Sequence, residues 1–154
     1  MATIREYLRE DLIQETLQGR SKEEILREFA ELFRRAHVVS EPQELVDRLM
    51  AREKLGSTGI GDGIAIPHAR VKNLTRVTVA FGRAPGGVDF NALDGKPTDL
   101  FFVLIAPEDV PGEHLKVLAR LSRLLRNPVF RDALRRARGR HELYEIIARE
   151  DARS

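Results

Sequence analysis

The sequence predicts an α/β fold, a single-domain sandwich in which α-helices flank a mixed β-sheet. Three observations support this prediction: apolar residues recur at helical spacing near both ends, they alternate or run uninterrupted in the middle, and helix-breaking glycines gather where the middle begins. The length suffices to bury one core, and no linker or repeat divides the chain, so residues 1–154 are expected to form one domain.

Two helices are expected between Ser21 and Gly56. Ser21 and Glu24 have the spacing of a capping box, a serine cap with a glutamate three residues later, and an apolar stripe follows them. A second helix is expected to start from Ser40, with Pro42 in its first turn, and to end near Gly56.

The middle of the chain is expected to form the sheet. Residues 64–66 are a short apolar run, residues 77–81 alternate with a period of two, and Gly86 with Gly87 indicates a turn. Residues 100–105 are apolar throughout, which is typical of a central strand covered on both faces.

Helical spacing returns after the sheet. Leu115 and Leu125 belong to the expected apolar stripe of one helix, and Asn127 with Pro128 is expected to stop it and to cap the next. Residues 143–147 are expected to add a last amphipathic turn or two.

Composition excludes several classes of protein. The chain has no cysteine, so disulfides, thiolate catalysis and cysteine-based metal sites are ruled out. The longest apolar run, residues 100–106, is too short to span a bilayer as a helix, and the N-terminus lacks the apolar core of a signal peptide. Membrane insertion is therefore not expected, and the chain is expected to be cytoplasmic.

Positive charge is unevenly distributed. The net charge is only +2, yet residues 120–140 hold eight arginines against a single acid, Asp132. Such a stretch could dock an acidic protein or a nucleic-acid backbone. The alternative, which we favour, is the solvated face of surface helices. A nucleic-acid partner is therefore the least favoured of the functions considered.

Among the four histidines, His68 has the most unusual setting. A short apolar run leads to it, Pro67 fixes the backbone before it, and a loop containing Gly59, Gly61 and Gly63 precedes that run. Backbone amides of such a loop can form a nest for an anion, and a neutral imidazole beside it is nucleophilic. The pattern fits a phosphoryl acceptor, whereas the alternative is a structural histidine beside ordinary turns.

Residues 52–68 closely resemble the phosphorylation-site signature of the fructose/mannitol-type enzyme IIA domains of the phosphoenolpyruvate-dependent sugar phosphotransferase system. The resemblance continues through residues 88–97, 100–106 and 113–115, and it spans about residues 5–150. It implies a phosphotransferase in which a histidine carries the phosphoryl group between proteins.

The resemblance also implies roles for single residues. His68 matches the histidine phosphorylated by the small phosphocarrier protein HPr, His114 matches a second histidine that helps to hold the phosphate, and Arg52 matches an arginine that pairs with it. A planar guanidinium and a helix start both suit phosphate oxygens. Thr58 could donate to the phosphate or only stabilise a turn; without the resemblance, Arg52 reads as a surface arginine and His114 as a cap.

No metal or other cofactor is expected. The histidines lack the tight pairing of a zinc site, and there is no H-E-x-x-H sequence. His37 and His141 match no catalytic position, so both are assigned to surface or core roles.

Two tasks within this family remain open. Residues 55–61 resemble the nitrogen-regulatory branch more than the mannitol branch, so we favour a signalling protein that binds a regulatory target. The other task is that of a transport component that passes phosphate from His68 to a separate IIB domain. A module that binds partners without phosphorylation is a further alternative to both. The sequence indicates neither the sugar, nor the target, nor the oligomeric state.

Overall fold

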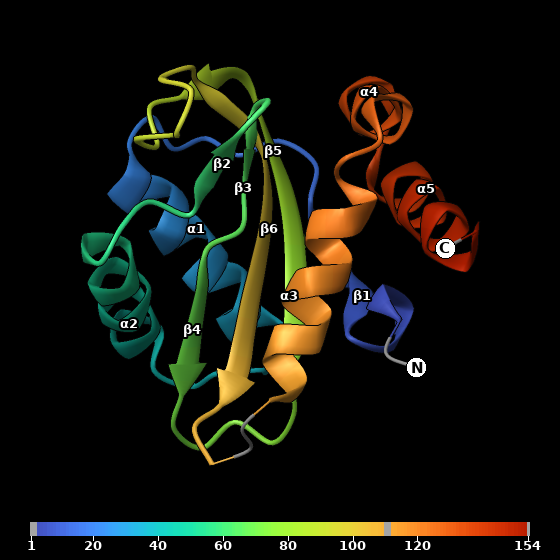
Figure 1. Ribbon diagram of the computed structural model, residues 1–154. Coiled ribbons are helices and arrows are strands. Elements are labelled where there is room, and N and C mark those ends of the chain that lie inside the picture. The colour runs from blue at the N-terminus through green and yellow to red at the C-terminus, as the bar shows by residue number, and fades with distance from the viewer. Residues whose placement is uncertain (1–2, 110–111, 154) are drawn as a thin grey trace.

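The computed structural model describes residues 3–109 and 112–153, and within them it confirms an α/β fold with a mixed sheet (Figure 1). The elements in chain order are η1 (Ile4–Glu6), β1 (Leu8–Gln14), α1 (Lys22–Arg35), α2 (Pro42–Lys54), β2 (Gly59–Gly61), β3 (Ile64–Ala65), β4 (His68–Val71), β5 (Thr78–Val88), β6 (Thr98–Pro107), α3 (Glu113–Leu124), α4 (Pro128–Arg136) and α5 (Arg140–Arg153).

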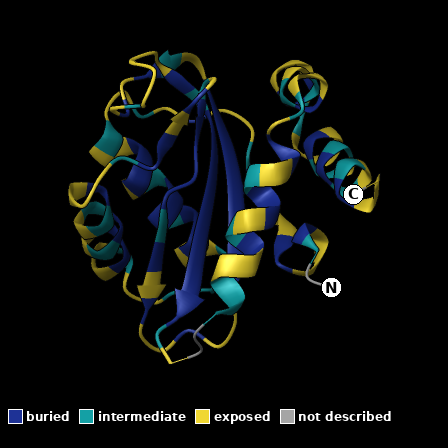
Figure 2. Cartoon of the chain, viewed as in Figure 1, coloured by how far each residue is buried: buried dark blue, intermediate teal, exposed yellow. Residues whose placement is uncertain are grey.

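Strand β6 is the centre of the sheet. It pairs antiparallel with β5 on one side and parallel with β3 and then β4 on the other. The order β1-β5-β6-β3-β2 extends the sheet to both edges, with β1 parallel to β5 and β2 antiparallel to β3. Helices α1 and α2 cover one face, while α3, α4 and α5 lie on the other (Figure 1). The central strands are therefore enclosed, as Figure 2 shows.

The core lies on both faces of β6. Every residue from 100 to 106 is at most 1% exposed, which confirms the central strand predicted from their uninterrupted apolar run. Successive side chains of a strand point to opposite faces. Phe101 packs against Phe29 of α1, with ring centroids 6.3 Å apart, and Phe102 packs against Phe81 of β5 at 4.7 Å. Burying each such ring contributes roughly 1.5–3 kcal/mol.

Two predicted helix caps are confirmed. The Ser21 hydroxyl accepts from the Glu24 amide at 3.2 Å, and the Asn127 side chain accepts from the Val129 amide at 3.0 Å. The capping box differs in one detail, because the Glu24 carboxylate accepts from the amide of Arg20 rather than that of the cap itself.

Two expectations were wrong: one concerns the start of α2, and the other concerns a turn at Gly86 and Gly87. Helix α2 begins at Pro42 with Glu41 as its cap residue, and no side chain caps it, so Ser40 lies outside the helix. Gly86 and Gly87 do not end a strand. Both have positive φ, 90° and 80°, and they lie inside β5, where the pairing with β6 shifts register. They form an irregularity of the kind that glycine permits within a strand.

Three further elements differ from expectation. Strand β1 has no alternating pattern, because exposed charges fill its middle, and the sequence does not indicate it. Helix α3 buries Val117, Leu121 and Leu124, whereas Leu115 of the predicted stripe is 59% exposed. Helix α5 has 14 residues rather than a turn or two. None of the helices in the described part of the chain has the length and apolarity that a membrane crossing requires.

Candidate functional site

His68 is the first residue after a break in the sheet. Strand β3 ends at Ala65, and β4 begins at His68, so the chain pairs with β6 twice and leaves the sheet between. The Pro67 carbonyl accepts from the Leu104 amide at 2.9 Å, which places His68 opposite Leu104. Proline suits this point because it has no amide to pair and its φ is fixed.

Two hydrogen bonds set the protonation of the His68 ring. Its Nδ1 lies 2.9 Å from the carbonyl oxygen of Ile66, and its Nε2 lies 3.3 Å from Nε of Arg52. A carbonyl only accepts and a guanidinium only donates. Nδ1 therefore carries the proton, and the lone pair of Nε2 faces Arg52. This neutral tautomer is the nucleophilic form of imidazole.

Arg52 is held from two directions. It lies in the last turn of α2, where its Nε donates to His68 and its Nη1 donates to the carbonyl of Gly56 at 2.8 Å. Gly56 has φ +143° just beyond the helix, a conformation that favours glycine. The end of the helix thus supplies the acceptor that orients the guanidinium.

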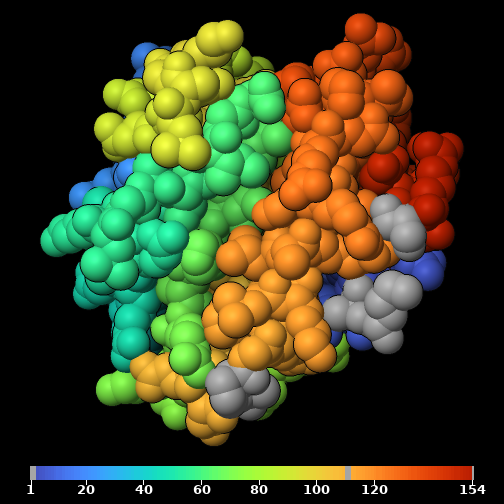
Figure 3. Space-filling view, viewed as in Figure 1, coloured from blue at the N-terminus to red at the C-terminus, as the bar shows by residue number. Residues whose placement is uncertain are grey.

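Arg52 and His68 line a pocket of about 360 Å³ between α2, β4 and the start of α3. In the space-filling view the surface of β4 lies between α2 on the left and α3 on the right (Figure 3). No described acid is among the lining residues, so the pocket suits an anion. The lining residues are Arg48, Ala51, Arg52, Leu55, His68, Ala69, Arg70, Leu104 and His114.

His114 reaches this pocket from α3, whereas Arg52 reaches it from α2. It is the second residue of α3 and is half-buried. Its Nδ1 is buried and has no hydrogen-bond partner among the residues that the structure describes. Burial lowers the pKa of His114 below its ordinary 6.5, and the charges of Arg70 and His68 lower it further. The structure thus brings together three residues that the sequence singled out: His68, His114 and Arg52.

The pKa of His68 is also lowered. Burial of the ring is the largest cause, and the positive charge of Arg52 adds to it. The hydrogen bond to the Ile66 carbonyl and the charge of Glu53 act in the opposite direction. Because the net shift is downward from 6.5, the ring is neutral at neutral pH.

Thr58 does not line this pocket. Its side chain is buried, its hydroxyl donates to the carboxylate of Glu53, and its amide donates to the same carboxylate at 3.2 Å. Lys22 of α1 pairs with Glu53 at 3.0 Å. The Thr58 hydroxyl is therefore engaged in a buried cluster that fastens the chain after α2, next to Arg52.

The sequence analysis did not single out Arg48 and Arg70, yet both line the pocket. A signal for each was present. Arg48 precedes Arg52 by four residues on a helix, and Arg70 follows His68 by two residues on a strand, so each pair shares one face.

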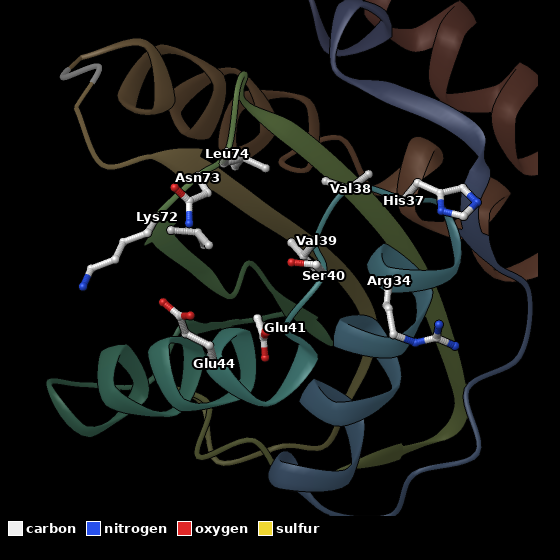
Figure 4. Close-up of a pocket in the computed structure, with 11 residues that line it drawn as sticks. Arg34, His37, Val38, Val39, Ser40, Glu41, Glu44, Lys72, Asn73 and Leu74 are labelled. Atoms are coloured by element: carbon white, nitrogen blue, oxygen red, sulfur yellow. The ribbon is translucent and has the colours of Figure 1, made fainter.

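A second pocket, of about 450 Å³, lies between the end of α1, the start of α2 and residues 71–74. Figure 4 shows that Lys72 points to the opposite side of the view from Arg34 and His37. Its polar groups do not converge on one point, so the pocket beside His68 is the candidate site.

Part of the basic stretch 120–140 has a structural role. Arg120 is buried and pairs with Asp151 at 2.7 Å, and Arg135 pairs with Asp99 at 2.8 Å. The guanidinium groups of Arg131 and Arg140 also donate to backbone carbonyls.

Comparison with known families gives one match over most of the chain. Residues 6–150 match the family described as "Phosphoenolpyruvate-dependent sugar phosphotransferase system, EIIA 2".

Similar proteins carry two kinds of name. The chain is 43% identical to a nitrogen regulatory protein of Pseudomonas aeruginosa over 129 residues, 84% of each chain. It is 35% identical over 148 residues to the fructose-specific EIIABC component of Bacillus subtilis, covering 96% of this chain and 23% of that protein.

Solved structures show the same division. Nitrogen regulatory protein IIA-Ntr of Neisseria meningitidis superposes with a TM-score of 0.85 at 37% identity, covering 92% of this chain and 97% of that one. Mannitol enzyme IIA of Escherichia coli, solved in complex with phosphorylated enzyme IIB, gives 0.76 at 27% identity, covering 90% and 94%.

Proposed function

Because this chain belongs to the EIIA 2 family of the phosphoenolpyruvate-dependent sugar phosphotransferase system, whose members are phosphocarriers, we propose that Nε2 of His68 accepts a phosphoryl group from an HPr-type protein. One observation carries the proposal: the lone pair of Nε2 is held toward a pocket lined by three arginines and a second histidine. A donor that draws on phosphoenolpyruvate would place the reaction in the cytoplasm.

The proposed step makes and breaks one bond. Nε2 of His68 attacks phosphorus, the new phosphorus–nitrogen bond forms, and the donor keeps the electron pair of the bond that breaks. The ring gains positive charge as the bond forms, and the Ile66 carbonyl, 2.9 Å from Nδ1, stabilises that charge through the proton between them. Alignment and charge stabilisation suffice for such a transfer.

Two further residues have roles in this proposal. Arg52 pairs with the phosphoryl oxygens, because its guanidinium already lies against the acceptor nitrogen. His114 contributes a neutral ring at the start of α3, where the helix dipole also favours an anion. Thr58 acts indirectly, by holding Glu53 and the chain after α2.

The test is intact-mass analysis after incubation with phosphoenolpyruvate, enzyme I and HPr from the same organism. The wild-type chain should gain one acid-labile phosphoryl group, and His68→Ala should gain none. His141→Ala is the matched control, because this histidine is exposed and lies on α5. Phosphorylation of His68→Ala, or none of the wild type, would contradict the proposal.

We propose signalling as the task of this phosphocarrier. The chain is similar to the nitrogen regulatory proteins of P. aeruginosa and N. meningitidis over most of their lengths. In this role the phosphorylated and unphosphorylated forms bind different regulatory targets. A target that binds phosphorylated wild type and His68→Ala with equal affinity would instead support a module that works without phosphorylation.

A second candidate task is sugar transport. It is favoured by the 96% of this chain that aligns with the fructose-specific component of B. subtilis. EIIA domains of this family also partner with IIB domains, as the mannitol complex of E. coli illustrates for that pair. Mixing the phosphorylated chain with IIB domains of the same organism separates the tasks. Rapid passage of the phosphoryl group to a IIB domain supports transport, and its retention supports signalling.

A further inference from the structure

Glu108 holds two of the pocket's arginines. This residue directly follows β6, and its carboxylate Oε2 pairs with Nη1 of Arg48 at 2.7 Å. Its backbone carbonyl accepts from Nη2 of Arg70. We call Arg48, Arg70 and Glu108 the arginine clamp. Both arginines line the pocket that contains His68, whereas Glu108 does not.

The clamp arginines are placed to serve an anion on His68. Arg48 lies one helical turn before Arg52 on α2, and Arg70 lies near enough to His114 for its charge to lower the pKa of that ring. Among the residues that the structure describes, Glu108 supplies the carboxylate that pairs with these arginines, through Arg48. Arg48 and Glu108 are each 36% exposed, so water weakens their pair and exchange is inexpensive.

We propose that Glu108 is a placeholder anion: it holds Arg48 in the lining of the pocket until the phosphoryl group on His68 draws this arginine away. The inference rests on the proposed function. A phosphoryl group carries nearly twice the charge of a carboxylate and offers three oxygens to a guanidinium, so it outcompetes Glu108 for Arg48. Arg70 donates to a backbone carbonyl, that of Glu108, so its charge stays available to the same anion.

This exchange gives phosphorylation an effect at the protein surface. Glu108 is paired with Arg48 while His68 is unphosphorylated, and it loses this partner when His68 carries a phosphoryl group. Its carboxylate then becomes free to bind a donor group on another protein. A regulatory target that reads the state of His68 would therefore meet a different charge arrangement beside the end of β6.

Competition fixes the sign of one measurable effect. Glu108→Gln removes the competing charge, so the equilibrium between phosphorylated HPr and the chain should move toward the phosphorylated chain by about two- to fivefold. A residue that merely supports the site would move it the other way or not at all, and either result overturns the proposal. Glu31→Gln is the control, because Glu31 is 45% exposed and also pairs with an arginine, Arg34, away from the pocket.

A double-mutant cycle separates exchange from simple repulsion between Glu108 and the phosphate. In an Arg48→Gln background, exchange predicts that Glu108→Gln has almost no effect. Repulsion alone predicts an effect as large or larger, because Arg48 no longer neutralises the carboxylate, and that result overturns the proposal. Failure of the proposed function is distinct, since the wild-type chain would then take up no phosphoryl group.

Discussion

Arg52 joins the end of its own helix to the ring of His68: Nη1 donates to the carbonyl of Gly56 at 2.8 Å and Nε donates to Nε2 at 3.3 Å. The guanidinium is therefore fixed at two points before any phosphate arrives. When phosphate arrives, Nε has to release the lone pair of Nε2, which attacks phosphorus, while the bond to Gly56 keeps the guanidinium beside the arriving negative charge.

Replacing Arg52 with lysine should slow phosphoryl transfer by about 100-fold, because lysine keeps the charge but loses the planar fork and the contact with Gly56. The measurement is the initial rate of transfer from phosphorylated HPr. Arg27→Lys, on the exposed side of α1, should keep the wild-type rate. A wild-type rate for Arg52→Lys would mean that charge alone suffices.

The pH dependence of transfer should follow the lowered pKa of His68. Only the neutral ring attacks phosphorus, and burial and Arg52 move its pKa below 6.5. The rate should therefore fall to half of its plateau value only below pH 6.5. In Arg52→Gln the fall should begin at higher pH, because one cause of the shift is gone. Rate profiles of both proteins with the same donor test this.

The same shift has a consequence for stability. The folded protein binds fewer protons at His68 than the unfolded chain between the lowered pKa and 6.5. His68 therefore contributes stability that is present above 6.5 and is lost as pH falls through the folded-state pKa. On acidification, the unfolding free energy of the wild type should therefore fall relative to that of His68→Gln. A pH-independent difference would contradict the shift.

Thr58→Val tests whether the hydroxyl serves the fold or the phosphate. Because it donates to the buried carboxylate of Glu53, its loss should lower the unfolding free energy by about 1–3 kcal/mol. Thr58→Ser should restore most of it. If the hydroxyl touched the phosphoryl group instead, Thr58→Val would slow transfer severely while leaving denaturant unfolding unchanged.

Asp151 should be among the most sensitive positions for stability. It is 1% exposed and accepts from Arg120 at 2.7 Å and from the backbone amide of Arg5 at 3.1 Å. Asp151→Ala leaves the buried Arg120 without this charge partner, which should cost about 3–5 kcal/mol in chemical denaturation. Asp11→Ala, which removes an exposed pair with Arg9, should cost less than about 1 kcal/mol.

His37→Gly should stabilise the protein by up to about 1 kcal/mol. His37 has φ +61° after α1, and the amide of Val38 bonds to the carbonyl of Phe33, the arrangement in which helices usually end with glycine. Asn73 also has φ +61°, but asparagine tolerates this conformation, so Asn73→Gly should gain less. Transfer to His68 should be unchanged in both variants. Destabilisation by His37→Gly would show that the imidazole itself contributes.

Elements with a local signal were predictable from the sequence. The cap at Ser21 and the central strand at residues 100–106 depend on neighbouring residues or on one apolar run. Strand β1 depends instead on a partner far along the chain, since Leu8 pairs with Val79, and its exposed charges hide it. The turn predicted at Gly86 is wrong for a related reason, because only the pairing with β6 shows that the strand continues.

The residues of the candidate site also divide into those with a signal in the sequence and those without one. The setting of His68 and the resemblance to a known family pointed to His68, Arg52 and His114, and helical or strand periodicity would have added Arg48 and Arg70. Neither route could predict the contact of Glu108 with Arg48, because this contact depends on how the end of β6 lies against α2. Such a contact is visible only in three dimensions.

The break between β3 and β4 separates two kinds of evolutionary constraint. The ring of His68 is aimed by the carbonyl of Ile66, a group that no substitution can remove, from only two residues away. Two of the three arginines around the pocket, Arg48 and Arg52, lie on α2, whereas Arg70 shares β4 with His68. Selection can therefore revise lining residues such as Ala51 and Leu55 to suit a new partner while the carbonyl of Ile66 keeps the reacting atom oriented. A protein built in this way can acquire a new binding partner while its phosphoryl-accepting atom and the group that orients it stay the same.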